Sequence, residues 1–189
     1  MSQFLTLPVI LIGIVAILII WVISVFNRLT VLKNRCAEAL SDMDVQLKRR
    51  FDLIPNLVET VKGYMQHEAG VLEAVTKART GIMEADGSPI ERVKAEDQLS
   101  GTLKTLFAVA ENYPDLKANT NFIELQKELS DTENKIMASR RFYNGNVQEF
   151  KTKTELFPSN IIARMFNFQV PAFFEVDNAE ERKNVQVKF

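Results

Sequence analysis

The sequence has very little of the residue types that build metal and redox sites. It contains one cysteine, Cys36, and one histidine, His67, among 189 residues. A single cysteine cannot form an internal disulfide, so nothing indicates an oxidising compartment. A single histidine cannot complete a zinc protease motif, and Val71 stands where the second histidine would follow His67 and Glu68. We therefore expect no metal site and no cofactor, with His67 on a helix surface.

Phosphate-binding loops and an excess of positive charge are missing too. The chain has no G-x-x-x-x-G-K-[ST] or G-x-G-x-x-G sequence, which leaves no basis for a nucleotide site. One histidine without suitable neighbours does not support a Ser-His-Asp arrangement either. A net charge of -1 argues against a strongly basic nucleic-acid binder. We predict that the protein is not an enzyme and does not bind nucleic acid.

One long apolar run lies near the N-terminus. The stretch Val9–Phe26, VILIGIVAILIIWVISVF, carries no charge. As a helix it spans about 27 Å, close to the hydrocarbon thickness of a bilayer. Trp21 lies near one end, a common position at the membrane interface. A cleaved signal peptide is the alternative, but residues 1–8 hold no Lys or Arg. We predict a transmembrane anchor over residues 1–27.

The charges that flank this run predict its orientation. Arg28, Lys33 and Arg35 follow it directly, and residues 48–50 add three more cations, whereas only the terminal amine precedes it. Positive charge is enriched on the cytoplasmic side of membrane helices. We expect a single-pass protein with its N-terminus outside and its domain in the cytoplasm.

The region from Asn27 to Glu84 is predicted to be one helix that continues the anchor. Its apolar residues recur every three or four positions, as in a helix with one buried face. Pro55 should kink this helix near Phe51, because proline lacks the N–H that would bond the carbonyl four residues back. Gly63 and Gly70 weaken it further.

A second long helix is expected after a turn at residues 85–89. Ser88, Pro89 and Glu91 fit the N-cap, N1 and N3 positions of a capping box with a proline start. Pro114 should end this helix, because the residue before a proline avoids the helical conformation.

A third long helix and a short fourth one follow. Asn121 with Glu124 is the start signal of the third, which is expected to run to about residue 157. Its apolar residues alternate at spacings of three and four, the heptad pattern of a left-handed helix–helix seam. Ser159 is the expected cap of the short helix, residues 160–166.

This order of elements predicts an all-α fold: a transmembrane helix continuing into an antiparallel bundle of three long helices plus a short C-terminal helix. Three long helices run out, back and out again, which places residues 157–174 far from the membrane. That segment is rich in phenylalanine and either caps the bundle or forms a subunit or partner contact. The candidate interface residues are Phe157, Ile161, Ile162, Met165, Phe166, Phe168, Phe173 and Phe174. Truncation after Phe157 should then lower the oligomeric state.

Two basic clusters, residues 48–50 and 140–141, are expected to form ion pairs along the long helices with Asp44, Asp52, Glu128, Asp131 and Glu133. Contact with anionic lipid or with another subunit is the alternative. The first cluster lies roughly 30 Å beyond the anchor if the chain is helical, which is too far for direct lipid contact. Arg28, Lys33 and Arg35 are better candidates for binding lipid headgroups.

Three stretches of the chain resemble the LemA family. They are DVQLKRRFDLIPNLVETVKGYMQHE (44–68), ENYPDLKANTNFIELQKELSDTENKIMASRRFYN (111–144) and FPSNIIARMFNF (157–168). The resemblance implies a bacterial membrane protein with one N-terminal helix, an all-α domain and no established catalytic residues. It also extends to magnetosome-associated membrane proteins. Asn167 departs from the glycine that is more usual before the last Phe, which concerns the local turn. The domains expected are the anchor, a cytoplasmic LemA-like domain over residues 28–174, and a flexible charged tail over residues 175–189.

A membrane-anchored scaffold or structural protein that acts through homo-oligomerisation fits these features best. The helical seams, the lack of catalytic motifs and the Phe-rich segment all agree with it. The alternative is an adaptor or regulator of another membrane protein, such as a membrane protease. The expected partners are membrane lipid, further copies of the chain and, in the alternative, that other membrane protein. The expected location is the bacterial inner membrane.

Overall fold

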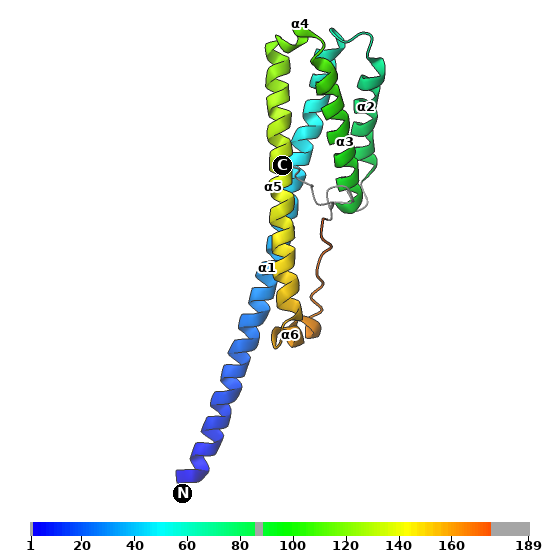
Figure 1. Cartoon of the computed structure of the whole chain (residues 1–189). Coiled ribbons are helices and arrows are strands. Elements are labelled where there is room, and N and C mark those ends of the chain that lie inside the picture. Colours follow the sequence, from blue (N-terminus) through cyan, green and yellow to red (C-terminus); the bar gives the residue numbers. More distant parts are fainter. Residues whose placement is uncertain (1, 86–88, 175–189) are drawn as a thin grey trace, which may run out of the picture. The chain divides into compact units, whose positions relative to one another are not determined.

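The computed structural model describes residues 2–85 and 89–174, with the side chains of residues 2–7, 89, 90, 93 and 94 left aside. Across these residues the chain is helical, which confirms the predicted all-α class. The elements are α1 (Ser2–Lys62), α2 (Ala69–Glu84), α3 (Pro89–Ala110), α4 (Pro114–Lys117), α5 (Thr120–Glu155) and α6 (Ser159–Met165) (Figure 1). The predicted tail at residues 175–189 and the predicted cap Ser88 lie outside the described residues.

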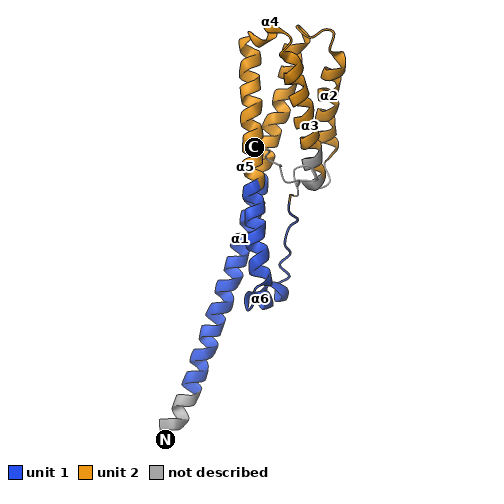
Figure 2. Ribbon diagram, in the orientation of Figure 1, with its two compact units in different colours: residues 1–41, 141–173 blue, residues 42–140, 174–189 orange. Residues whose placement is uncertain are grey.

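The chain divides into two compact units (Figure 2). Unit 1 consists of residues 1–41 and 141–173, and unit 2 of residues 42–140 and 174–189. Helices α1 and α5 each contribute one part to either unit. The apolar anchor and α6 belong to unit 1, whereas α2, α3 and α4 belong to unit 2.

Unit 2 is a bundle of four antiparallel helix segments, from α1, α2, α3 and α5 (Figure 1). Its core takes residues spaced three or four apart from each helix, as the sequence pattern predicts. The fully or nearly fully buried members are Ile54, Leu57, Val61, Met65, Val75, Ala78, Leu99, Leu103, Leu106, Ala110, Leu116, Phe122 and Leu129. Burial of these side chains is the main stabilising contribution to the unit.

The predicted single helix over residues 27–84 is wrong in one respect: the chain turns after Lys62 and starts α2 at Ala69. The turn begins at Gly63, because glycine lowers the stability of a helix. The amide N–H of Met65 bonds the carbonyl oxygen of Val61 at 3.0 Å, and the Met65 side chain is fully buried in the core. Burying Met65 stabilises a reversal that local helix propensity alone does not predict.

Helix α1 continues through Pro55 without ending. The carbonyl of Phe51, which would normally accept from residue 55, accepts instead from Nε of Arg79 on α2 at 3.4 Å. The Arg79 guanidinium carbon also lies 3.9 Å from the centre of the Phe51 ring, a cation–π contact. A side chain of another helix therefore replaces the missing donor. A kink at Pro55 stays a prediction.

The prolines and caps between α3 and α5 differ from the prediction. Helix α3 ends at Ala110, and Pro114 begins the short helix α4, because its fixed φ and missing N–H suit a first helical position. Helix α5 is capped by Asn119, whose Oδ1 accepts from the N–H of Phe122 at 3.1 Å. The predicted start at Asn121 was therefore two residues late.

Several basic residues of unit 2 form ion pairs, mostly between helices. Buried Arg50 lies 3.5 Å from the carboxylate of Glu96 and also pairs with Glu133. Glu133 accepts from the hydroxyl of Ser100 at 3.1 Å. The exposed pairs are Arg49 with Glu128, Arg92 with Asp44 and Arg140 with Asp97. The predicted pairing partners Glu128 and Glu133 are confirmed, whereas Glu96 was not foreseen.

Burial raises the pKa of Glu96 to about 7, and the guanidinium of Arg50 only partly opposes this. Glu96 is 1 % exposed, and its Oε1 has no hydrogen-bond partner among the described residues. A neutral Glu96 is thus favoured at mildly acidic pH.

Candidate membrane-proximal site

The N-terminal part of α1 is suited to cross a membrane. A window of this helix has a mean hydropathy of 3.2, and none of the window is buried. From Val9 to Ile20 every side chain is exposed, and the run carries no charge. Exposed aliphatic side chains over this length match the hydrocarbon core of a bilayer.

Beyond the anchor, α1 packs against the C-terminal part of α5 in unit 1. The buried residues are Leu29, Leu32, Cys36 and Ala39 on α1 and Tyr143, Val147 and Phe150 on α5. These α5 residues follow the predicted three–four alternation. Cys36 is buried, and burial raises the pKa of its thiol, which disfavours the reactive thiolate.

One ion pair and one further pair of neighbouring side chains show that α1 and α5 are antiparallel in unit 1. Arg28 of α1 pairs with Glu149 of α5 at 2.6 Å. Further along α1, Cys36 lies near Tyr143, whose pKa is raised mainly by burial and also by that thiol. The α5 chain therefore advances toward the anchor, and Glu155 lies about 9 Å beyond Glu149 in that direction.

Helix α6 follows a tight turn at the end of α5. The hydroxyl of Ser159 donates to the carbonyl oxygens of Lys153 and Leu156, at 2.7 and 2.9 Å. The prediction that Ser159 is the N-cap of α6 is therefore wrong: its hydroxyl bonds carbonyl oxygens at and just beyond the C-terminus of α5.

The end of α6 is a Schellman turn. The N–H of Phe168 bonds the carbonyl of Ala163 at 2.9 Å, and that of Asn167 bonds the carbonyl of Arg164 at 3.2 Å. Asn167 has a φ of 52°, a left-handed conformation that Gly adopts freely and Asn tolerates. Asn167 can thus replace the more usual glycine, and the turn directs Phe168 back toward α1.

The Phe-rich segment lies next to the membrane anchor. The ring of Phe26, the last residue of the apolar run, is 4.8 Å from that of Phe166 and 5.6 Å from that of Phe168, both edge to face. Phe150 of α5 also contacts Phe168, at 6.2 Å. The predicted position far from the membrane is wrong, because the extra reversal after Lys62 makes α5 run back toward the anchor.

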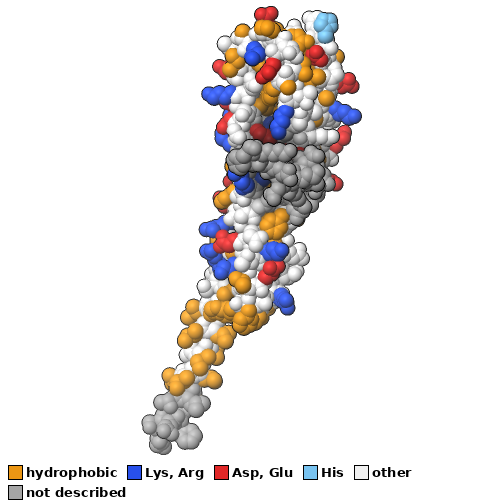
Figure 3. Space-filling model, in the orientation of Figure 1, with side chains coloured by type: hydrophobic (Ala, Val, Ile, Leu, Met, Phe, Trp, Pro, Cys, Tyr) orange, Lys and Arg blue, Asp and Glu red, His pale blue; other side chains and the backbone are white. Residues whose placement is uncertain are grey.

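The candidate interface residues fall into two groups. Ile162 is 2 % exposed and Phe174 is 7 % exposed, so these two are core residues, and Phe168 and Phe173 are partly buried. Phe157, Ile161, Met165 and Phe166 are exposed, as is Leu156 beside them. Figure 3 shows hydrophobic side chains gathered along the N-terminal part of α1 and around α6. Only the second group is available for a contact.

The predicted headgroup-binding residues lie just beyond the apolar run. Arg28 pairs with Glu149 and stays about half exposed, whereas Lys33 and Arg35 are exposed on the α1 surface. Residues 27–41 and 141–173 together carry seven Lys or Arg and three Asp or Glu. This excess of cations suits an anionic membrane surface.

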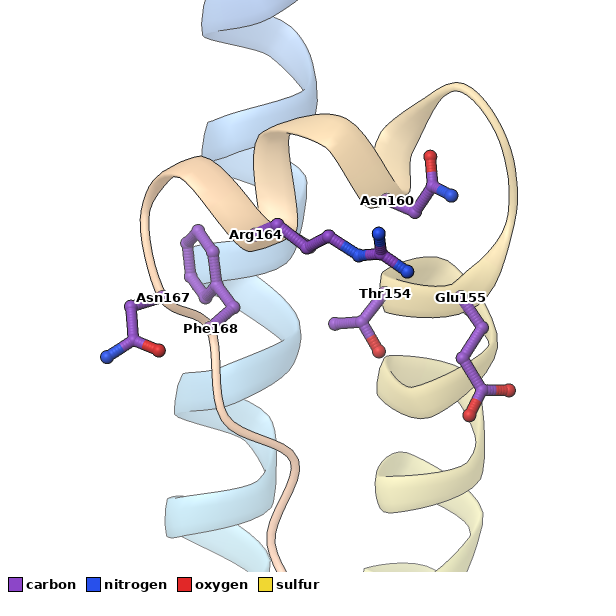
Figure 4. Close-up of a pocket in the computed structure, with 7 residues that line it drawn as sticks. Thr154, Glu155, Asn160, Arg164, Asn167 and Phe168 are labelled. Carbon is purple, nitrogen blue, oxygen red and sulfur yellow. The ribbon is translucent and has the colours of Figure 1, made fainter.

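A hollow between the end of α5 and α6 was not predicted from the sequence (Figure 4). It is lined by Thr154, Glu155, Asn160, Ala163, Arg164, Asn167 and Phe168. The Arg164 side chain extends across it toward Thr154 and Glu155 (Figure 4). A guanidinium here can bind a phosphate or carboxylate group. The one signal of this hollow in the sequence is the basic residue Arg164 on the otherwise apolar short helix that also carries Ile161 and Met165.

No group of three or more His, Cys, Asp and Glu side chains able to hold a metal occurs within the described part of the chain. His67 lies exposed in the turn before α2, as expected for a surface residue, although not on a helix.

Similarity to known proteins agrees with this architecture. Residues 39–189 match the model of the LemA family. Protein LemA of Metamycoplasma hominis is 29 % identical over 157 residues, which cover 82 % of this chain and 70 % of that protein. Magnetosome proteins MamQ 1 and MamQ 2 of Paramagnetospirillum magneticum are each 21 % identical over 175 residues, which cover 79 % of this chain and 64 % of theirs. With the family match extending over most of its length, the chain belongs to the LemA family.

Proposed function

We propose that this protein is a membrane-anchored helical scaffold that acts through homo-oligomerisation and catalyses no reaction. The proposal rests on the polar interior of unit 2. Among the described residues, the buried charged side chains are Arg50 and Glu96, and together with Glu133 they join α1, α3 and α5. Charged groups that bridge helices specify how the helices pack, which is a structural role.

The names of the relatives support the same reading. Two of them are named magnetosome proteins, and the third is named only for its family. None of these names refers to a reaction, which fits a protein that works by holding a structure together.

A shallow hollow on unit 2 offers a surface for contact between copies. Its apolar lining comes from Leu47, Phe51, Ile82 and Met83, and Met83 is 63 % exposed. Charges of both signs, Asp44, Lys48 and Arg92, surround it. A surface with an apolar centre and mixed charges can pair with itself across a two-fold axis.

We propose further that the domain lies in the cytoplasm, with the anchor in the bacterial inner membrane. The cations near the end of the anchor support this orientation by the positive-inside rule, and α5 and α6 add Lys151, Lys153 and Arg164 to those of α1. A cysteine introduced by Ser2→Cys in a Cys36→Ala chain should react with a membrane-impermeant maleimide on spheroplasts. If that cysteine is protected and a cysteine on α5 reacts instead, the protein has the opposite orientation.

The mass of the full-length protein in detergent tests the scaffold. We expect a homogeneous homo-oligomer, and Met83→Lys should lower its mass by placing a charge in the contact. Ile123→Lys is the matched control, because Ile123 is also exposed, at 50 %, but lies on α5 away from this hollow. A monomer for the unmodified chain would overturn the proposal. A monomer recovered with a stoichiometric membrane protein would favour the adaptor function.

A further inference from the structure

The C-terminal end of the anchor helix is partly buried on one face, whereas residues 9–20 are exposed on all faces. Val22, Val25 and Phe26 are partly buried, and they lie three and four residues apart, on one face of α1. The rings of Phe166 and Phe168 account for the cover over Phe26. The tip of the α5–α6 hairpin thus lies beside the last turn of the apolar run.

The register of α5 against α1 also places the tip of the α5–α6 hairpin beside the end of the apolar run. Glu149 pairs with Arg28, and the antiparallel α5 continues for six residues to Glu155. At about 1.5 Å per residue, Glu155 is level with about Val22 of α1. The turn after Glu155 then lies at about the depth of Val22, and Phe166 at the end of α6 lies beside Phe26, so the hairpin tip is level with the end of the anchor, where Trp21 marks the membrane interface.

The side chains at this level are those an interfacial segment needs. Phe157 is 78 % exposed and Met165 67 % exposed, and they are joined by Leu156, Ile161 and Phe166. Arg164 extends from the same short helix into the polar hollow (Figure 4). Apolar side chains below the headgroups with a basic side chain among them are the features of a segment lying in the membrane interface.

We propose that the hairpin tip, residues 156–166, inserts into the membrane interface beside the anchor and forms a second membrane contact. Leu156, Phe157, Ile161, Met165 and Phe166 enter the boundary of the acyl chains, and Arg164 binds a lipid phosphate. The sequence-based alternative, a contact with another subunit, is less well supported because the exposed residues are continuous with the surface of the anchor. This inference does not depend on self-association.

Two contacts fix the domain more firmly than one. A single helix allows rotation about its axis at little cost, whereas a hairpin that must stay in the interface restricts that rotation. Unit 1 then presents one face to the bilayer.

Fluorescence quenching in vesicles tests the proposal. Full-length protein with Cys36→Ala and one of Phe157→Cys, Met165→Cys, Ile17→Cys or Gln126→Cys is labelled with a polarity-sensitive fluorophore. It is then reconstituted in phosphatidylcholine with phosphatidylglycerol. Ile17 is 70 % exposed in the anchor and reports the hydrocarbon, while exposed Gln126, near the start of α5, reports water. We expect nitroxide-labelled lipid to quench the labels at 157 and 165 several-fold more than the label at 126, and aqueous iodide to quench them less.

Two outcomes would overturn the insertion. Labels at 157 and 165 that behave like the one at 126 would show that the tip lies in water. Labels shielded from both quenchers would show a protein contact instead. Using two positions guards against one cysteine disturbing the turn. Lipid quenching at 157 should also weaken when phosphatidylglycerol is left out, and Arg164→Gln should reduce that dependence, with Arg28, Lys33 and Arg35 still present. An unchanged dependence in Arg164→Gln would overturn the phosphate contact.

Discussion

Arg79 of α2 donates from Nε to the carbonyl oxygen of Phe51 on α1, 3.4 Å away, where the N–H of residue 55 would bond in an uninterrupted helix. Pro55 frees that carbonyl, and the guanidinium also lies over the Phe51 ring. Loss of both contacts in Arg79→Ala should lower the free energy of unfolding by about 2 kcal/mol. Denaturant unfolding in detergent measures it, with Lys77→Ala on the exposed face of α2 as the control.

The link between Arg79 and Pro55 is tested by a double-mutant cycle. Pro55→Ala restores a backbone donor for the Phe51 carbonyl, so Arg79→Ala should cost less in that chain than in the unmodified one. Equal costs in both chains would show that the arginine does not compensate for the proline.

The stability of unit 2 should depend on pH through Glu96. Its pKa is about 7 in the folded protein, against 4.5 for an ordinary glutamate, so the folded state holds a proton that the unfolded state releases. The free energy of unfolding should therefore fall as the pH rises from about 4.5 to 7, by roughly 3 kcal/mol, and level off above that. Glu96→Gln should flatten this part of the profile. A profile that Glu96→Gln leaves unchanged would contradict the assignment.

Two neighbouring arginines, one buried and one exposed, should contribute differently to the free energy of unfolding. Arg50 is 3 % exposed and holds Glu96 and Glu133, so Arg50→Leu should cost about 3 kcal/mol or more by leaving carboxylates without their cation. The cost should shrink at pH 5, where Glu96 is protonated. Arg49→Leu removes only exposed pairs, with Glu128 and Asp131, and should cost less than about 1 kcal/mol. Similar costs for the two variants would mean that Arg50 is hydrated in solution.

Neighbouring isoleucines of α6 offer a similar comparison. Ile162 is 2 % exposed and Ile161 is 51 % exposed. Ile162→Ala should destabilise unit 1 by about 2–4 kcal/mol through loss of buried methyl groups, and limited proteolysis should then cut after α5. Ile161→Ala should change stability by less than about 0.5 kcal/mol. If the two variants are equally sensitive to protease, α6 does not pack on α1 and α5 as described.

The sequence by itself determined the class of the fold and the anchor. An uncharged run of this length is suited to cross a bilayer as a helix, and the three–four spacing of apolar residues marks the buried faces of α1, α3 and α5. Both signals depend on neighbouring residues along the chain, so they can be recognised without any tertiary contact.

Only the tertiary structure decided where the C-terminal segment lies. The reversal after Lys62 depends on Met65 entering the core, a gain that comes from residues distant in sequence. That one additional turn changes the number of long helices and makes α5 antiparallel to α1, so that Phe166 meets Phe26 within unit 1. The pairing of Arg50 with Glu96 and the donor that Arg79 supplies to Phe51 are likewise contacts between helices, set by their packing and not by local spacing.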